Sequence, residues 1–142
     1  MIIRKREEKD NNEIVKVWFE ASSIAHPFLD ADFVEKEKKD LIDIYLPNAD
    51  IWVCVENNTV IGFISMLGNE IGGLFVSPNK QSKGIGTQLV NFVWELYSEL
   101  EVEVFEKNQI GIAFYEKYGF VQIKRYYHTE SRNYMLRLHY KI

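Results

Sequence analysis

The segment from Val76 to Leu89, which runs VSPNKQSKGIGTQL, constrains the fold more than any other part of the sequence. A strand-forming run ends there, a loop with Gly84 and Gly86 follows, and a helix begins. The first N–H groups of a helix have no partner within it and carry the positive end of the helix dipole. Because glycine has no Cβ, a bulky anion can approach such a helix start closely. We therefore expect an α/β fold in which this loop binds phosphate or pyrophosphate.

Two common nucleotide-binding motifs do not fit this loop. A P-loop requires a glycine five residues before Gly84 and a lysine directly after it, whereas Asn79 and Ile85 stand there. The dinucleotide pattern G-x-G-x-x-G fails because Leu89 occupies the third glycine position. The residues alone leave open whether the loop binds an anion or is an ordinary helix start.

Hydrophobic periodicity predicts the order of the remaining elements. The expected elements are a strand over 2–4, a helix from Asp10, a helix from Asp30 or Asp32, strands over 51–55, 60–67 and 70–76, a helix over 84–98, a strand over 100–105, a helix over 109–118, and strands over 120–127 and 133–140. This order predicts one α/β domain over residues 1–142, with a mixed sheet and helices on its faces.

Several local signals refine these expectations. Asp10 and Glu13 have the spacing of a capping box, which would begin the first long helix at Asp10. Pro47 is expected just past the end of the second helix. The pair Gly72–Gly73 inside a strand predicts a bulge or a close approach by another part of the molecule or a ligand.

Composition limits the class of partner. The chain has 142 residues, of which 46% are apolar, enough for the core of one domain. Its formal net charge of -4 argues against nucleic acid or an anionic membrane as the main partner, because both attract basic surfaces. The one cysteine, Cys54, lies in an apolar run and is expected to be a buried, inert thiol. The start of the chain lacks the apolar core of a signal peptide, so a cytoplasmic location is expected.

Three motifs carry a resemblance to a known family. The sequence QSKGIGT over 81–87 resembles the Q/R-x-x-G-x-G/A signature of the GNAT superfamily of acetyltransferases. EVFEKN over 103–108 and AFYEKYGF over 113–120 are similar to the second half of that family's domain. The resemblance covers residues 51–124, and reaches the first fifty residues only through the order of elements. It implies a GNAT-type domain with a twisted, mostly antiparallel sheet and helices on both faces.

The resemblance also implies a cosubstrate, acetyl-coenzyme A, and the residues that would bind it. The pyrophosphate would be held by the backbone of Gln81, Ser82, Lys83, Gly84, Ile85, Gly86 and Thr87. The pantetheine arm would pair with the backbone of Leu74, Phe75 and Val76. Asn108 would form a hydrogen bond with the same arm, and Tyr115 would lie near the thioester sulfur.

Attack of an amine on a thioester needs a neutral amine, a stabilised oxyanion and a hydrogen-bonded leaving thiolate. Tyr115 is the expected donor to that thiolate; the alternative is that its ring only packs. Glu70 and His26 are the candidate bases, against an exposed strand-end carboxylate and a packing histidine as their alternatives. A water relay without an essential base is a further alternative. His128 is a candidate for the acceptor site, and no set of residues has the spacing of a metal site.

Several functions remain open at this stage. The first is an acetyl-CoA-dependent N-acetyltransferase that modifies a primary amine of a small molecule or a peptide. The second is a coenzyme A-binding sensor or partner module without turnover, and the third is another nucleotide-binding α/β protein. Trp18, Phe28, Tyr126 and Tyr127 suggest an aromatic acceptor site, although these side chains are equally suited to a core. The combination of Trp18, His26–Phe28 and Tyr45–Pro47 is similar to a bacterial GNAT subgroup of poorly defined substrate. A monomer and a homodimer are both compatible with the sequence.

Overall fold

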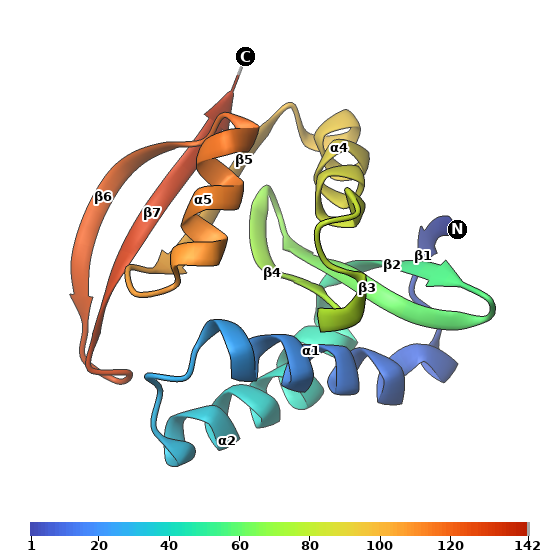
Figure 1. The fold of residues 1–142 in the computed structure, drawn as a ribbon, viewed down its shortest axis with the longest axis horizontal. Coiled ribbons are helices and arrows are strands. Elements are labelled where there is room, and N and C mark those ends of the chain that lie inside the picture. Colours follow the sequence, from blue (N-terminus) through green and yellow to red (C-terminus); the bar gives the residue numbers. More distant parts are fainter. Residues whose placement is uncertain (142) are drawn as a thin grey trace.

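A computed structural model describes residues 1–141, which form one seven-stranded sheet with helices against both faces (Figure 1). The strands are β1 (Ile2–Lys5), β2 (Asp50–Glu56), β3 (Thr59–Leu67), β4 (Glu70–Val76), β5 (Glu99–Phe105), β6 (Val121–His128) and β7 (Asn133–Lys141). The helices are α1 (Asn11–Ala25), α2 (Ala31–Asp40), α3 (Leu46–Asn48), α4 (Ile85–Tyr97) and α5 (Gln109–Tyr118), with a π-helical turn over Leu41–Tyr45 and short 3-10 helices over Glu8–Asp10 and Pro78–Lys80. The predicted fold class is confirmed.

The strand order is β1-β2-β3-β4-β5-β7-β6, and every pair is antiparallel except β4 with β5. That parallel pair is very short, because only Glu70 with Glu101 and Ile71 with Val102 face each other in register. Beyond Ile71 the two strands separate, as the open space between β4 and β5 in Figure 1 indicates. The sheet is therefore divided into a half formed by β1–β4 and a half formed by β5–β7.

Successive side chains of the central strands point to opposite faces of the sheet, and a hydrophobic core lies on each face. On one face of the sheet, Ile64 and Met66 of β3 belong to a cluster that includes the buried positions of α4. On the other face, Val60 and Phe63 pack with α1. The α4-face core also takes in Val102, Val104, Leu136 and Leu138, so it spans both halves of the sheet. The α1-face core includes no buried residue from β5–β7.

Helix α4 shows how the pattern of apolar residues selects the buried face. Ile85, Leu89 and Val93 recur at helical spacing and are buried. Val90 is buried with them, whereas Leu96, which is also apolar, is 55% exposed. Cys54 is a buried free thiol on the α4 face, in agreement with its apolar surroundings in the sequence.

The predicted capping box of Asp10 and Glu13 is wrong. The chain is already helical at Asp10, whose buried carboxylate accepts from Arg4 at 2.8 and 3.1 Å and from Glu7 N–H at 2.8 Å. The hydrogen bond from Arg4 lowers the pKa of Asp10 below its usual range. Glu13 instead accepts from the backbone N–H of Val60 at 3.2 Å, a contact between α1 and β3 that the helix pattern does not reveal.

The second helix begins as predicted but ends later. Asp30 caps it, because its side chain accepts from Phe33 N–H at 2.9 Å. The expectation that Pro47 lies past the helix is wrong, since Pro47 is inside the final turn, Leu46–Asn48. Leu46 N–H bonds back to Leu41 across a π-helical turn, and Pro47 lies early in the turn that follows, where a missing N–H is tolerated.

Gly72 is the extra residue of a bulge in β4, as the paired glycines predicted. Ser65 of β3 faces Gly73 and Met66 faces Ile71, so Gly72 has no opposite residue. A Cβ built on Gly72 would lie 2.9 Å from the Tyr45 ring of the π-helical turn. The glycine therefore permits both the bulge and the close approach of that ring.

Replacing Gly72 with alanine is expected to destabilise the protein by about 1–3 kcal/mol, because the methyl group overlaps the Tyr45 ring. Chemical denaturation of the wild type and Gly72→Ala measures this difference. In a Tyr45→Ala background the same substitution should cost much less, since the obstructing ring is gone. An equal loss in both backgrounds would contradict the packing explanation.

Candidate active site

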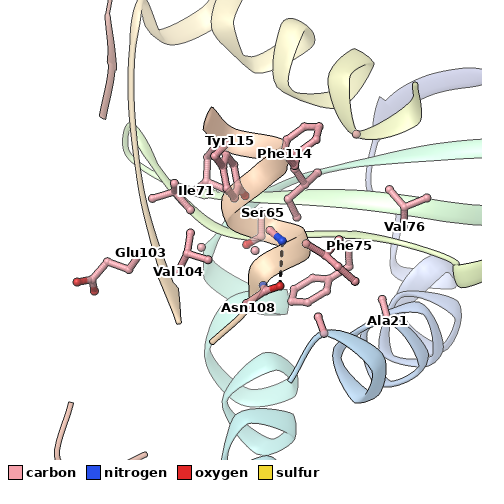
Figure 2. Close-up of a pocket in the computed structure, with 18 of the residues that line it drawn as sticks. Ala21, Ser65, Ile71, Phe75, Val76, Glu103, Val104, Asn108, Phe114 and Tyr115 are labelled. Atoms are coloured by element: carbon pink, nitrogen blue, oxygen red, sulfur yellow. Dashed lines mark hydrogen bonds between the residues drawn. The ribbon is translucent and has the colours of Figure 1, made fainter. Parts of the chain in front are cut away.

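A cavity of about 1250 Å³ opens where β4 and β5 separate, and residues from both faces of the sheet line it. Figure 2 shows Ile71, Phe75, Val104, Asn108 and Tyr115 around this opening. The cavity brings together nearly all the residues that the sequence singled out. Those that line it are His26, Glu70, Leu74, Phe75, Val76, Gln81, Ser82, Gly84, Ile85, Gly86, Thr87, Asn108, Tyr115 and His128, whereas Lys83 does not.

The loop before α4 has the backbone conformation of an anion-binding concavity. Ser82 and Gly84 both have left-handed backbones, with φ of 64° and 81°. Left-handed residues in such a turn direct successive N–H groups into one concave surface. A Cβ built on Gly84 finds no atom within 4 Å, so the space beside it is open. A Cβ on Gly86, by contrast, would lie 3.2 Å from Phe114 of α5, so this glycine also serves helix packing.

The free edge of β4 offers backbone groups to the cavity. Ser77 N–H donates to β3 at 2.8 Å, and bonded and non-bonded positions alternate along an antiparallel ladder. This alternation directs the polar backbone groups of Phe75 toward β3, and those of Leu74 and Val76 toward the open side. The carbonyl of Val76 accepts from the Gln81 side chain at 3.0 Å. The expectation that Phe75 pairs with a ligand through its backbone is therefore not supported, and Leu74 retains the free groups.

Tyr115 is fixed by the way α5 ends. Its carbonyl accepts from Phe120 N–H at 2.9 Å, while Gly119 N–H reaches Glu116 at 3.1 Å, the paired bonds of a Schellman cap. The hydrophobic contact that accompanies such a cap is present, because the Tyr115 and Phe120 ring centroids lie 5.1 Å apart. Tyr115 is buried, and burial raises the pKa of its phenol well above the usual range. The hydroxyl therefore stays protonated at neutral pH. It can donate a hydrogen bond, but it is a weak proton donor.

Asn108 and His26 form a bridge between α1 and α5. The Asn108 side-chain oxygen caps α5 by accepting from Gly111 N–H at 2.9 Å, as Figure 2 shows. Its amide nitrogen lies 3.2 Å from Nε2 of His26. The amide thus donates to the histidine and caps the helix at once, which leaves one amide hydrogen for a ligand.

His26 is poorly suited to act as a base. Burial lowers its pKa to about 4, so the ring is neutral at physiological pH and holds a proton only weakly. Its Nε2 lone pair is directed to Asn108, and its Nδ1 is buried without a partner in the described part of the chain. The ring packs edge-on against Phe28 and Phe105, with centroids 5.8 and 5.1 Å away. The packing alternative therefore agrees better with the structure.

Glu70 is held in an ion pair. Arg137 of β7 donates to its carboxylate at 3.1 and 3.5 Å and also donates to Glu101 at 2.8 Å. These carboxylates raise the pKa of Arg137 beyond its usual range. Both carboxylate oxygens of Glu70 already accept from the Arg137 guanidinium, so Glu70 is less free to contact a substrate amine and is a weaker candidate for the base than its place in the sequence indicates.

Several side chains that line the cavity from the α1 face carry no functional signal in the sequence. Among them are Glu37 of α2, Tyr45 of the π-helical turn and Ser65 of β3. Glu37 belongs to the run EKEKKD, which is typical of a solvated helix face, and nothing in its neighbours indicates a cavity. Of the proposed aromatic acceptor residues, Trp18 lines the cavity, whereas Tyr127 is 49% exposed.

These features define an α/β protein with a split sheet, an anion-binding loop and a buried tyrosine beside the split. A family model of the acetyltransferase (GNAT) domain matches residues 47–122. The chain belongs to the GNAT family of acetyltransferases, and is thus an acyltransferase.

Two curated relatives from Escherichia coli (strain K12) extend the match beyond that segment. The peptidyl-lysine N-acetyltransferase YiaC is 33% identical over 120 residues, covering 84% of this chain and 82% of the relative. The peptidyl-lysine N-acetyltransferase YjaB is 33% identical over 119 residues, covering 83% of this chain and 80% of the relative.

Solved structures agree with the fold. The solution structure of the apo form of YjaB from Escherichia coli matches with a TM-score of 0.86 and 29% identity, covering 99% of this chain and 98% of that one. The PaiA N-acetyltransferase from Thermoplasma acidophilum, solved in complex with coenzyme A, matches with a TM-score of 0.72 and 21% identity. The match covers 99% of this chain and 100% of that one. Among residues 1–141, no helix has both the length and the apolar character needed to cross a membrane.

The partly buried, neutral His26 makes stability depend on pH. Because its folded pKa of about 4 lies below the ordinary 6.5, the unfolded chain binds more protons at this residue in that window. The contribution of His26 to the free energy of unfolding should therefore fall as the pH drops from 6.5 toward 4, by at most about 3 kcal/mol. Urea denaturation of the wild type and of His26→Gln at pH 7 and pH 5 isolates this contribution from those of other groups that titrate in the same window.

The substitution His26→Gln should reduce the loss of unfolding free energy between pH 7 and pH 5. The matched control is His139→Gln, because the ring of His139 contacts Glu99 at 2.8 Å on the sheet rather than in the cavity. Because His139 lies outside the cavity, this variant should leave the contribution of His26 in place. If His26→Gln and the wild type lost equal stability between the two pH values, His26 would not be the responsible group.

Proposed function

We propose that this protein transfers the acetyl group of acetyl-CoA to a primary amine, with the lysine side chain of a peptide or protein as the preferred acceptor. The observation that carries the proposal is the free edge of β4, which runs from Leu74 into the left-handed loop at Ser82 and Gly84 and faces Tyr115 across the cavity. The names of the relatives YiaC and YjaB support lysine as the acceptor.

Each part of the site matches one part of the cosubstrate. In this proposal the backbone of the loop from Gln81 to Thr87 holds the pyrophosphate, where N–H groups converge at the start of α4. Leu74 pairs with the amide groups of pantetheine as an added strand would, and the remaining amide hydrogen of Asn108 supplements that pairing. Lys83 takes part through its backbone, as a member of this loop, whereas its exposed side chain is not among the residues that line the cavity.

The reaction is a direct transfer between two bound substrates. Acetyl-CoA supplies an activated acetyl group as a thioester. The neutral amine attacks the carbonyl carbon, a C–N bond forms, and the C–S bond breaks with the electron pair left on sulfur. The Tyr115 hydroxyl then donates a hydrogen bond to the departing thiolate. Its raised pKa favours hydrogen bonding over full proton transfer, since a thiol is the stronger acid of the two.

Coenzyme A and acetyl-CoA are expected to raise the melting temperature, because a ligand at 100 times its dissociation constant stabilises the fold by about 2.7 kcal/mol. Thr87→Glu tests the location, since Thr87 is exposed in the first turn of α4. The added charge should stabilise the helix start by about 0.3–1 kcal/mol but weaken coenzyme A binding about tenfold or more.

The control is Thr87→Gln, which adds similar bulk without charge. Calorimetric titration with coenzyme A measures affinity, and thermal denaturation without ligand measures stability. Unchanged affinity in Thr87→Glu would show that the pyrophosphate binds elsewhere. Binding without release of free thiol, over a panel of small amines and lysine peptides, would identify a coenzyme A-binding module instead of an enzyme.

Tyr115→Phe is expected to lower kcat about 100-fold, the lower end of the range for proton-donor assistance, while acetyl-CoA affinity stays nearly unchanged. The ring is retained between Phe114 and Phe120, so the melting temperature should change little. Thiol release under saturating substrates and calorimetry supply the two readouts. A variant with full kcat and rate-limiting chemistry would remove Tyr115 from the mechanism, and a large loss of melting temperature would favour a packing role.

A further inference from the structure

The part of the cavity on the α1 face forms a distinct chamber. We call it the α1-face chamber and define it by Trp18, Phe33, Glu37, Tyr45, Phe63 and Ser65, all of which line the cavity. Phe63 and Trp18 belong to the α1-face core, and Ser65 follows Phe63 by two residues on the same strand. The chamber is therefore mainly aromatic, with a carboxylate and a hydroxyl as its principal polar side chains.

Ser65 indicates that this chamber accommodates a polar ligand. Its side chain is 2% exposed, and its hydroxyl has no hydrogen-bond partner within residues 1–141. A buried hydroxyl without a partner costs free energy, and native proteins rarely retain one. An apolar residue would fill the same place on β3 more favourably if the chamber only packed against itself.

Glu37 is the second polar group, and it is likewise unpaired. Its carboxylate is half-buried and makes no salt bridge or hydrogen bond with any other described residue. Its neighbour Lys36 is already bound to Asp40 and to Glu130 of the β6–β7 turn, each at 3.1 Å. Burial raises the pKa of Glu37 to about 7, and the nearby Asp40 contributes in the same direction.

The charges around the chamber favour a cation over an anion. The other ionisable groups that line the cavity on this side are Lys36 and Asp40 on α2, His26 at the end of α1, Tyr45 on the π-helical turn, Glu70 on β4, and His128 and Glu130 by the β6–β7 turn. The carboxylates in this set outnumber the one lysine, and Arg137 already binds Glu70 and Glu101. An ammonium group on a long apolar stem, as in lysine, matches an aromatic chamber that contains a carboxylate.

We propose that Glu37 binds the ammonium group of the acceptor and accepts its proton. This inference rests on the proposed acetyl transfer. It assigns to α2 the base that the sequence had placed at Glu70 or His26, since Arg137 holds the first and Asn108 is bonded to the second. A half-buried carboxylate among aromatic side chains attracts an ammonium group more strongly than a carboxylate in bulk water does.

The proton balance of the step is complete. One N–H bond of the ammonium group breaks, its electron pair stays on nitrogen, and the proton moves to the Glu37 carboxylate. The neutral amine then attacks the thioester carbonyl, and the second amine proton leaves with the sulfur as the free thiol. The Glu37 carboxyl returns its proton to water. A base whose pKa lies near the working pH is suited to this exchange.

The decisive experiment is the pH profile of Glu37→Gln with acetyl-CoA and the best blocked lysine peptide from the panel above. For the wild type, kcat/KM should rise with pH through about 7, because only the ionised carboxylate accepts a proton. In Glu37→Gln we expect kcat/KM to fall about 100-fold or more, and its rise with pH through about 7 to disappear. Glu37→Asp should retain the rise of kcat/KM with pH, at a lower activity. Glu35→Gln, an exposed change on the same helix, is the matched control and should behave as the wild type.

Stability and cofactor binding separate this role from a structural one. Because burial disfavours the charged form of Glu37, the Glu37→Gln protein should melt at a higher temperature than the wild type at pH 8, with the difference shrinking toward pH 5. Its affinity for coenzyme A should be unchanged. If Glu37→Gln kept the activity of the wild type and the same rise of kcat/KM with pH, the assignment of Glu37 would be overturned. If the wild type itself acetylates no member of the panel, the proposed function fails, and the assignment fails with it.

Discussion

The short seam between β4 and β5 is the constraint on which the rest of the structure depends. Two residue pairs join the halves of the sheet, so the hydrogen-bond ladder alone would hold them weakly. The α4-face core compensates by spanning the seam with packed side chains from β3, β5 and β7. The molecule is thus held together by burial of apolar surface on one face, which leaves the backbone edge of β4 free for a ligand.

The opposite face shows the complementary arrangement. Its core ends before β5, and α1 and α2 reach the second half of the sheet through isolated contacts. They include the hydrogen bond from the Asn108 amide to His26, the contact between the Phe28 and Phe105 rings, and the ion pair between Lys36 and Glu130. The ring of Phe33 also contacts the rings of Phe105 and His128. Space between such bridges becomes the α1-face chamber. One face of the seam is therefore held together by packed side chains, and the other leaves an open chamber.

Unsatisfied polar groups gather at the same place. Buried side-chain atoms without partners in the described residues include Nδ1 of His26 and the Ser65 hydroxyl, and both residues line the cavity. Glu37 adds a carboxylate whose charged form is disfavoured by burial. Each lowers the stability of the protein alone, and such costs are usual where a site is prepared for a substrate.

What the sequence reveals about the site depends on how local the chemistry is. The helix that starts after Gly84 and the helix that ends before Gly119 were predictable, because the residues that begin and end a helix act within a few positions of one another. The Schellman cap illustrates this, since Tyr115, Gly119 and Phe120 form it within one turn.

Residues whose role depends on distant partners could not be found in this way. Glu37 lies in a charged run that resembles any solvated helix, and only the fold of α2 against the split sheet makes it a cavity residue. Glu70 appeared free at a strand end, whereas Arg137, far along the chain, neutralises it. The π-helical turn that admits Pro47 has no simple sequence signature either.

The free edge of β4 also has a consequence for the behaviour of the protein in a crowded solution. Exposed strand edges are templates for pairing with other molecules, and proteins commonly protect them with charges, prolines or short strands. Here the unpaired segment lies inside the sheet, beside β5, rather than at its rim. A foreign strand would have to enter the cavity to pair with it, and the Gly72 bulge interrupts the regular ladder just where such pairing would extend. The edge is accordingly open to a slender extended ligand and sheltered from the sheet edges of neighbouring proteins, so the opening needed for binding does not become a site of aggregation.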